Sequence, residues 1–250
     1  MKPSKTDFFL TIIIPTYNSS KTLRVALESL LIQEYQYFEV LIIDGLSNDD
    51  TVLIANEYKK KINKLTIISE KDKGIYDAMN KAITISKGNW LYFMGSDDSL
   101  YEVNTLLKIK ELSNFKEYDI IYGNVISSRF KDVYDGEFTY DKIFNKNICH
   151  QAVFFKKEIF KLTGQFNLKY KAHADWDHNI KWFLNKRIKQ KHVDLIIANY
   201  ADGGFSSVNG DVVFQKEKLQ LFLKRGLFVL PIKNILKLSK MLVYSFLKGQ

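Results

Sequence analysis

Residues 90–98 read Trp-Leu-Tyr-Phe-Met-Gly-Ser-Asp-Asp, and they are the most informative segment of the chain. An apolar run that ends at a glycine and two adjacent acids predicts a buried strand that delivers carboxylates to its C-terminal edge. Ligands of open α/β sheets bind at that edge, and two carboxylates there suit Mg²⁺ or Mn²⁺ and, through the cation, a diphosphate. Asp97 and Asp98 would also suit a solvated turn or a helix N-cap, and this segment alone leaves that alternative open.

The chain around this segment alternates short apolar runs with amphipathic ones. Strands are predicted over 10–14, 40–43, 65–68, 90–94 and 119–122, and helices after Ser19 or Ser20, from about residue 50, over 75–86 and over 103–112. Strands that are apolar on both faces and alternate with such helices indicate a mostly parallel sheet covered on both sides. The sequence therefore predicts an α/β fold whose residues 1–123 form a doubly wound, nucleotide-binding half.

The pattern changes after Gly123. Residues 125–138 predict a hairpin or irregular strands, and a strand over 150–155, a helix over 175–186 and a short strand over 195–199 follow. We expect this part of the chain, residues 124–215, to form the acceptor side of a cleft.

Residues 216–250 are expected to form a basic, amphipathic C-terminal helical tail. No acid occurs from 219 to 247, and Lys233, Lys237 and Lys240 fall on one helical face with apolar residues between them. A helix of this kind can lie in the interface of an anionic membrane. Packing on the chain's own domain is the alternative that the sequence leaves open.

Composition and charge exclude several classes of protein. A chain of 250 residues with 46% hydrophobic residues can bury one substantial core. The net charge of +9 allows nucleic acid, an anionic membrane or phosphorylated substrates as partners, but no nucleic-acid-binding motif is present, so we expect no nucleic-acid partner. The single cysteine, Cys149, excludes an internal disulfide and fits a reducing compartment such as the cytoplasm. No apolar run approaches the roughly 20 residues of a membrane-spanning helix.

Acidic residues follow nearly every predicted strand of the first half. The four loops cover residues 15–18, 44–51, 70–74 and 95–98. Asp44 can accept a hydrogen bond from the N–H of a uracil-type base or from a ribose hydroxyl, and Asp72 could contact the base or ribose from the other side. Lys73 could meet a phosphate, although a solvated lysine is as ordinary an interpretation.

The first of these loops contains no glycine, because the first glycine of the chain is Gly45. This excludes the two glycine-rich loops that bind phosphates in dinucleotide-binding and Walker-type proteins. A cation held by acids would then have to neutralise a diphosphate, and we expect Asp98 to hold it.

In this order the motifs resemble family 2 glycosyltransferases of the GT-A fold, over roughly residues 8–210. The segments that carry the resemblance are Ile-Ile-Pro-Thr-Tyr-Asn (13–18), Asp-Gly-x-Ser-x-Asp-x-Thr (44–51), Asp-Lys-Gly-Ile-Tyr-Asp-Ala-Met-Asn-Lys (72–81), Gly-Asn-Trp (88–90), Ser-Asp-Asp (96–98), Cys-His-Gln-Ala (149–152), Ala-Asp-Trp-Asp (174–177) and Gly-Gly-Phe-Ser (203–206). The segment 72–81 is similar to the subgroup that builds bacterial surface polysaccharides. The family often has Asn or Asp where this chain has Gly95, and Glu where it has Ala174.

The resemblance implies a role for several residues. Asp44 would hold a uracil-like base in a pocket shaped by Thr16 and Tyr17, with the Asp72–Lys73 loop nearby. Asp98 would ligate the metal, and Asp97 would contact the ribose or the donor sugar. The resemblance also implies a catalytic base.

That base would be Asp175, which would deprotonate the acceptor hydroxyl for an in-line, inverting attack on the anomeric carbon. A helix N-cap is the structural alternative for Asp175. His150 and Gln151 could line the acceptor site, or His150 could be an ordinary buried histidine. Trp176 could stack on a sugar ring or belong to the core. Ser206 could close a loop over the diphosphate or follow an ordinary glycine turn.

These observations lead to one expectation and two alternatives. We expect an inverting hexosyl- or N-acetylhexosaminyltransferase that depends on Mn²⁺ or Mg²⁺ and takes a nucleotide diphosphate sugar, which the resemblance implies to be UDP-linked. It would work on a glycan or lipid-linked acceptor at the inner face of the cell membrane. In this interpretation residues 1–123 bind the nucleotide sugar and 124–215 form the acceptor-binding and catalytic half. One alternative is a nucleotidyltransferase, and the other is a catalytically silent nucleotide-sugar-binding subunit of a membrane assembly complex.

Overall fold

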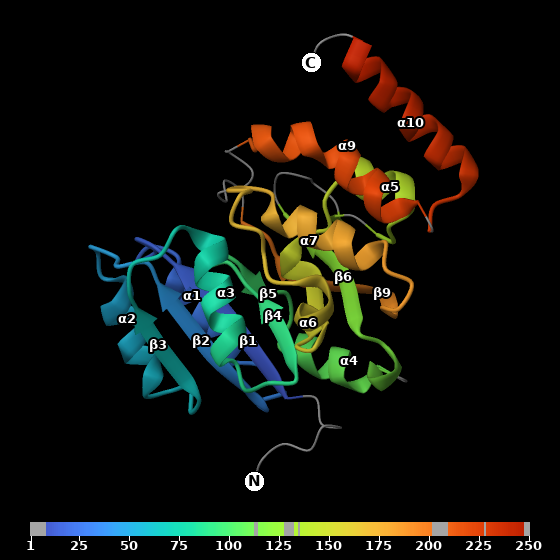
Figure 1. The fold of residues 1–250 in the computed structure, drawn as a ribbon. Coiled ribbons are helices and arrows are strands. Elements are labelled where there is room, and N and C mark those ends of the chain that lie inside the picture. The colour runs from blue at the N-terminus through green and yellow to red at the C-terminus, as the bar shows by residue number, and fades with distance from the viewer. Residues whose placement is uncertain are drawn as a thin grey trace.

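The computed structural model describes residues 9–112, 115–127, 133–134, 136–201, 210–227 and 229–247. In these residues a nine-stranded sheet runs through the domain with helices on both faces, and the last two helices lie at the opposite end from α2 and β3 (Figure 1). The strands are β1 (Leu10–Thr16), β2 (Phe38–Asp44), β3 (Leu65–Ser69), β4 (Trp90–Phe93), β5 (Ser99–Leu100), β6 (Ile120–Ile126), β7 (Val133–Tyr134), β8 (Val153–Lys156) and β9 (Gln190–Asn199).

The described helices follow the strands in alternation through the first half and cluster in the second. They are α1 (Leu23–Leu31), α2 (Thr51–Lys59), α3 (Ile75–Ile85), α4 (Thr105–Glu111), η1 (Phe115–Glu117), α5 (Tyr140–Asn145), η2 (His150–Ala152), α6 (Ile159–Thr163), α7 (Ala174–Phe183), α9 (Val212–Gly226) and α10 (Ile232–Leu247), where η marks a 3₁₀-helix. Of these, α1, α2 and α4 pack on one face of the sheet, and α3, α6, α7 and α9 pack on the other.

The first four long strands form the predicted parallel, doubly wound half. Their order is β3-β2-β1-β4, and every neighbouring pair is parallel. β1 and β2 are buried along their whole length because successive side chains enter the cores on opposite faces: Leu10, Ile12 and Ile14 point to one core and Ile13 to the other. This α/β fold is the one that the sequence predicts.

Beyond β4 the sheet becomes mixed, so the parallel arrangement belongs mainly to the first half. β8 pairs antiparallel with both β4 and β6, whereas β9 runs parallel to β6 and antiparallel to the short β5. Where the sequence predicts a hairpin or irregular strands, over 125–138, the end of β6 pairs antiparallel with the short β7. The predicted strand over 150–155 begins only at Val153, because residues 150–152 form the 3₁₀-helix η2.

The two C-terminal helices are joined at Pro231, which cannot continue a helix from α9. α9 buries Phe214 and Phe222 in the same core as α7, so the boundary expected at residue 215 falls inside a helix of the domain. α10 packs against α9 and contributes Leu238 to that core. Among the described residues, no helix combines the length and the apolar character that crossing a membrane requires.

Candidate active site

The C-terminal ends of the parallel strands are level with one another. Thr16 at the end of β1 lies opposite Asp44 of β2, and Asp44 lies opposite Ser69 of β3. The loops that follow are therefore adjacent, and they form one edge of the sheet. This edge is where the sequence places the nucleotide site.

Asp44 is fully buried and holds these strand ends together. It accepts hydrogen bonds from the hydroxyls of Thr16 (3.1 Å) and Ser69 (2.6 Å) and from the amide and hydroxyl of Ser47. Burial alone would raise the pKa of this carboxyl, but the donors outweigh burial and hold the pKa below its ordinary value. Of the two residues expected beside it, Thr16 is buried on Asp44, whereas Tyr17 is exposed.

Hydrogen bonds between the loops support this edge. The Asn18 amide donates to Ser47 Oγ (2.8 Å), and the Asn48 amide donates back to Asn18 Oδ1 (2.9 Å). The hydroxyl of Ser96, in the loop after β4, lies 2.8 Å from that of Ser19, the residue that follows the first loop. The first loop is thus tied to the second and the fourth.

Asp72 reaches the same edge from the loop after β3. A Cβ atom on Gly45 would lie 2.8 Å from Asp72 Oδ2, so the glycine allows this carboxylate to sit beside the β2 loop. Asp72 Oδ1 also accepts a hydrogen bond from the Gly74 amide (2.8 Å). Lys73 is exposed. The structure therefore places Asp72 beside the loop that begins at Asp44 and leaves Lys73 at the surface.

Asp98 lies beneath the loop that follows β4 and is only 1% exposed. Its Oδ2 atom accepts hydrogen bonds from the Gly95 amide (2.9 Å) and Gln151 Nε2 (2.8 Å), and its Oδ1 atom accepts one from the Ala201 amide (2.9 Å). Burial raises its pKa, and the neighbouring charge of Asp97 acts in the same direction. Asp97 itself is half-buried and so has the more accessible of the two carboxylates.

The chemistry of this pair fits a hard divalent cation. A Cβ atom on Gly95 would lie 2.7 Å from Asp97 Oδ1 and still closer to Asp98 Oδ2, so oxygens of both carboxylates border the space that the glycine leaves open. Among the described residues no group of three or more His, Cys, Asp or Glu side chains could hold a metal ion. Proteins commonly bind Mg²⁺ through one or two carboxylates, while phosphates and water supply the rest of its coordination shell.

Asp175, in the first turn of α7, is 4% exposed and lies in a network of donors. Its Oδ1 atom accepts from the Tyr76 hydroxyl (2.9 Å) and the Trp176 amide (2.8 Å), and its Oδ2 atom accepts from Asn147 Nδ2 (2.9 Å). His150 Nδ1 lies 3.4 Å from the same Oδ2. Burial alone would raise the pKa of Asp175, but these partners, His150 foremost, hold it below its ordinary value.

The 3₁₀ turn η2 links the two buried acids. Its first residue, His150, contacts Asp175, and its second, Gln151, donates to Asp98. Two consecutive side chains therefore tie the carboxylate after β4 to the carboxylate at the start of α7. The Nε2 atom of His150 is buried and has no hydrogen-bond partner among the described residues.

Two further site residues, Tyr76 and Asn80 of α3, were not among the predicted ones. Tyr76 contacts both Asp175 and the Ala172 carbonyl (2.9 Å), and Asn80 exchanges two hydrogen bonds of 2.9 Å with the backbone of Phe166. They clamp α3 to the loop that precedes α7. Both belong to the segment 72–81, which carries part of the family resemblance. That segment does not reveal which residues Tyr76 and Asn80 contact.

Two predicted residues, Trp176 and Ser206, are not part of the site that the structure describes. Trp176 is a core residue, since its ring packs on Phe214 (5.3 Å between centroids) and its indole nitrogen donates to the Ile143 carbonyl (2.8 Å). Of the two roles that the sequence left open for Trp176, this burial supports the core one and contradicts stacking on a sugar ring. Ser206 lies outside the described residues.

Comparison with known proteins identifies the family. Residues 11–188 match the family described as Glycosyl transferase family 2. A PGL/p-HBAD biosynthesis glycosyltransferase of Mycobacterium tuberculosis is 38% identical over 210 residues, which cover 82% of each chain. A chondroitin synthase of Escherichia coli is 30% identical over 235 residues, which cover 90% of this chain and 33% of that one.

Two solved structures share the fold at low sequence identity. Residues 1–349 of Staphylococcus aureus TarS, in complex with UDP-GlcNAc, align with a TM-score of 0.73 and 21% identity over 86% of this chain and 66% of that one. The mannosyltransferase PcManGT from Pyrobaculum calidifontis, in complex with GDP-Man and Mn²⁺, aligns with a TM-score of 0.64 and 18% identity over 89% of this chain and 64% of that one. Both likenesses concern the arrangement of the sheet and its helices.

Proposed function

The chain belongs to glycosyl transferase family 2, and from this premise we propose that it is a metal-dependent, inverting enzyme that moves a hexosyl or N-acetylhexosaminyl group from a UDP-sugar to a glycan or lipid-linked acceptor. The observation that carries the proposal is the pair of buried acids, Asp98 and Asp175, joined through two consecutive residues of η2. Two acids held by neighbouring residues suit a reaction in which one acid faces the donor's diphosphate and the other faces the acceptor hydroxyl.

The donor would bind across the loops that follow β1, β2 and β3. Asp44 ends β2 there and Asp72 lies against Gly45, the next residue, and carboxylates of this kind can accept from base or ribose donors. The solved relatives support a nucleotide diphosphate sugar, since one is in complex with UDP-GlcNAc and another with GDP-Man. We place the base against the Asp44 loop, with Tyr17 as the exposed ring that can close over it.

Asp97 and Asp98 would hold the Mn²⁺ or Mg²⁺ ion beside Gly95. When bound, such an ion neutralises charge on the diphosphate leaving group. Because Asp98 is buried under three donors, we propose that Asp97 supplies the oxygen that is reached first and that Asp98 fixes the loop from below. The complex of PcManGT with Mn²⁺ supports a metal in this fold.

Asp175 would act as the base. Its lowered pKa keeps the carboxylate ionised at neutral pH, and its donors hold the orientation of both oxygens. The Nε2 atom of His150 has no partner among the described residues. We propose that an oxygen of the bound substrate pairs with it, so that His150 orients the acceptor while its other nitrogen steadies Asp175. The proton of the acceptor hydroxyl would pass to Asp175 as its oxygen attacks the anomeric carbon.

We further propose a glycan or lipid-linked acceptor at the inner face of the membrane. The mycobacterial relative, named for PGL/p-HBAD biosynthesis, and the chondroitin synthase support an acceptor in glycan assembly. Family membership speaks against the nucleotidyltransferase alternative, whereas the silent-subunit alternative is decided by turnover.

The test is a nucleotide-release assay with the Asp175→Asn variant as the decisive comparison. The protein is given UDP-, GDP- and TDP-sugars with Mn²⁺ or with a chelator, and with membrane lipid extract as the acceptor source. We expect release from a UDP-sugar that is lost with chelator and that falls by at least about 10³-fold in Asp175→Asn, while the Kd for the donor is unchanged. Near-normal turnover of the variant would overturn the assignment of the base, and turnover in chelator would overturn the role of the metal.

A further inference from the structure

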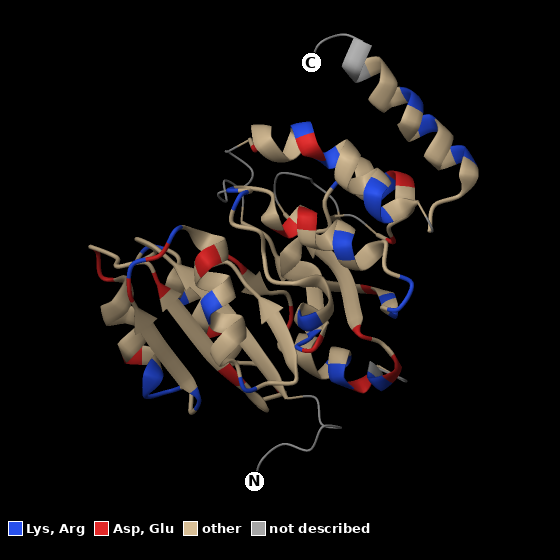
Figure 2. Ribbon diagram, viewed as in Figure 1, with Lys and Arg blue, Asp and Glu red and all other residues tan. Residues whose placement is uncertain are grey.

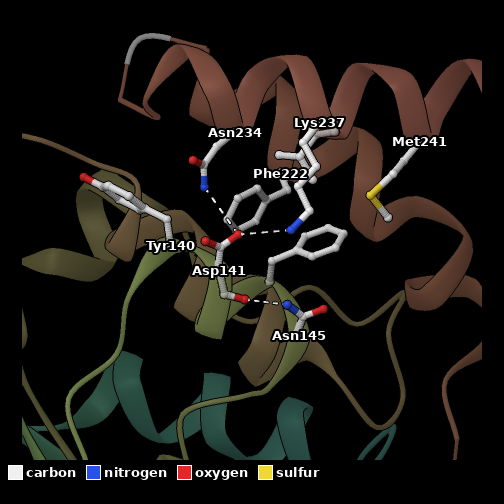
Figure 3. A pocket seen from close by; sticks show the side chains of 9 residues that line it. Tyr140, Asp141, Asn145, Phe222, Asn234, Lys237 and Met241 are labelled. Atoms are coloured by element: carbon white, nitrogen blue, oxygen red, sulfur yellow. Dashed lines mark hydrogen bonds and ion pairs between the residues drawn. The ribbon is translucent and has the colours of Figure 1, made fainter.

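The last helix, α10, has an inner face that packs on the domain. Leu238 is buried in the main core and Ile235 is packed against it. At the junction with α5, shown in Figure 3, Asp141 accepts a hydrogen bond from Asn234 Nδ2 (3.4 Å) and forms an ion pair with Lys237 Nζ (3.6 Å). These contacts hold the helix on the domain and fix which face it turns outward.

The outer face of α10 is apolar and exposed. Ile232 is 77% exposed, Leu236 57% and Val243 58%. These residues are four and seven positions apart, a spacing that places their side chains in one stripe along the helix. Scattered exposed apolar residues are ordinary, but several aligned along one helix indicate a binding surface.

The charged side chains that α10 itself carries are all positive. Lys233 and Lys240 are exposed beside the stripe, and α10 contains no acid. Lys224 and Arg225 are also exposed in the last turn of α9, which leads into α10. In Figure 2 α10 shows blue bands and no red one. A helix with an apolar stripe and cationic flanks matches the chemistry of an anionic phospholipid surface.

We infer that the stripe formed by Ile232, Leu236 and Val243, with Lys233 and Lys240 beside it, docks the domain on an anionic bilayer. A second copy of the chain is a poorer occupant of the same face, because it would bring its own lysines against these. The 16-residue helix would lie in the interface and not cross it.

The docked face is connected to the reaction site through α9. The ring of Phe214 on α9 packs on Trp176, the neighbour of Asp175 in α7. Binding at α10 would therefore hold α7 and the acceptor side of the site at the surface where lipid-linked substrates occur. This consequence rests on the proposed function, whereas the docking itself does not.

Vesicle cosedimentation of the full chain, without any sugar donor, tests the docking. Vesicles of phosphatidylcholine alone are compared with vesicles that contain one third phosphatidylglycerol. We expect binding to the anionic vesicles, weakened at least about 10-fold by Leu236→Glu, and weakened roughly 25-fold by Lys233→Gln with Lys240→Gln, because each lysine near such a surface contributes about five-fold. Equal binding to both kinds of vesicle, or no binding to either, would overturn the inference.

Leu53→Glu is the matched control, since Leu53 is an exposed leucine (60%) on α2, far along the sheet from α10. It should bind vesicles as the unmodified chain does. Loss of binding in this variant, or a dimer that Leu236→Glu converts to monomer in size-exclusion chromatography, would show that α10 is not a lipid-docking helix. An unchanged melting temperature checks that the Leu236→Glu variant is folded.

Discussion

Removing the Tyr76 hydroxyl should weaken both the fold and the reaction, because that hydroxyl contacts the buried carboxylate of Asp175. A hydrogen bond to a charged group contributes about 1.5–3 kcal/mol, so we expect Tyr76→Phe to lower the free energy of unfolding by about 2 kcal/mol. For a chain of this size that is a fall of about 4–8 °C in melting temperature. Asn147, His150 and the Trp176 amide still hold Asp175, so turnover should fall roughly 10-fold and not vanish.

Tyr92→Phe is the matched control for this variant. Tyr92 is as deeply buried, and its hydroxyl donates to a neutral acceptor, the Gln151 carbonyl, at 2.9 Å. Loss of a neutral hydrogen bond should cost about 1 kcal/mol, or about 2–4 °C. Differential scanning calorimetry of the two variants, with a transfer assay on each, isolates the effect of the charge on Asp175. Equal melting temperatures together with full turnover in Tyr76→Phe would refute the reasoning.

Two further changes test the metal loop and the core. In Gly95→Ala the added methyl group would press on the carboxylates of Asp97 and Asp98. We therefore expect Mn²⁺-dependent donor binding, measured by titration calorimetry, to weaken at least about 10-fold. Metal-dependent binding of normal strength would contradict the proposed role of the space beside Gly95. Burial lowers the pKa of His178 to about 3. Below about pH 6.5 the imidazole therefore binds a proton in the unfolded state but stays neutral in the folded state. The free energy of unfolding should fall as the pH falls from 7, by about 2 kcal/mol at pH 5. Urea unfolding at pH 7 and pH 5 should show this loss in the unmodified chain and not in His178→Phe. An equal loss of stability in both proteins would exclude His178 as its source.

The strands and helices of the first half could be predicted closely because their signals are local. β1, β2 and β3 begin and end within two residues of the predicted strands, since each is a short apolar run bounded by Pro, Asp-Gly or polar residues. α3 likewise ends one residue before its predicted end, where Lys87 and Gly88 follow.

The elements of the second half were harder to predict because they are short or are set by their partners. α5 and α6 have six and five residues, too few for a helical period to stand out. β9 is twice the length of the predicted strand over 195–199, because pairing with β6 extends it back to Gln190.

The sequence alone was enough to identify the family and to single out Asp44, Asp98 and Asp175, because family motifs are runs of neighbouring residues. Tertiary structure decided what these acids contact. Tyr76 lies 99 residues before Asp175, and Gln151 lies 53 residues after Asp98. No periodicity or motif encodes such a pairing, since it depends on how α3, η2 and α7 pack on the sheet. The same packing buried Trp176 in the core and left the stripe on α10 facing outward, because burial is a property of the assembled domain and not of a segment.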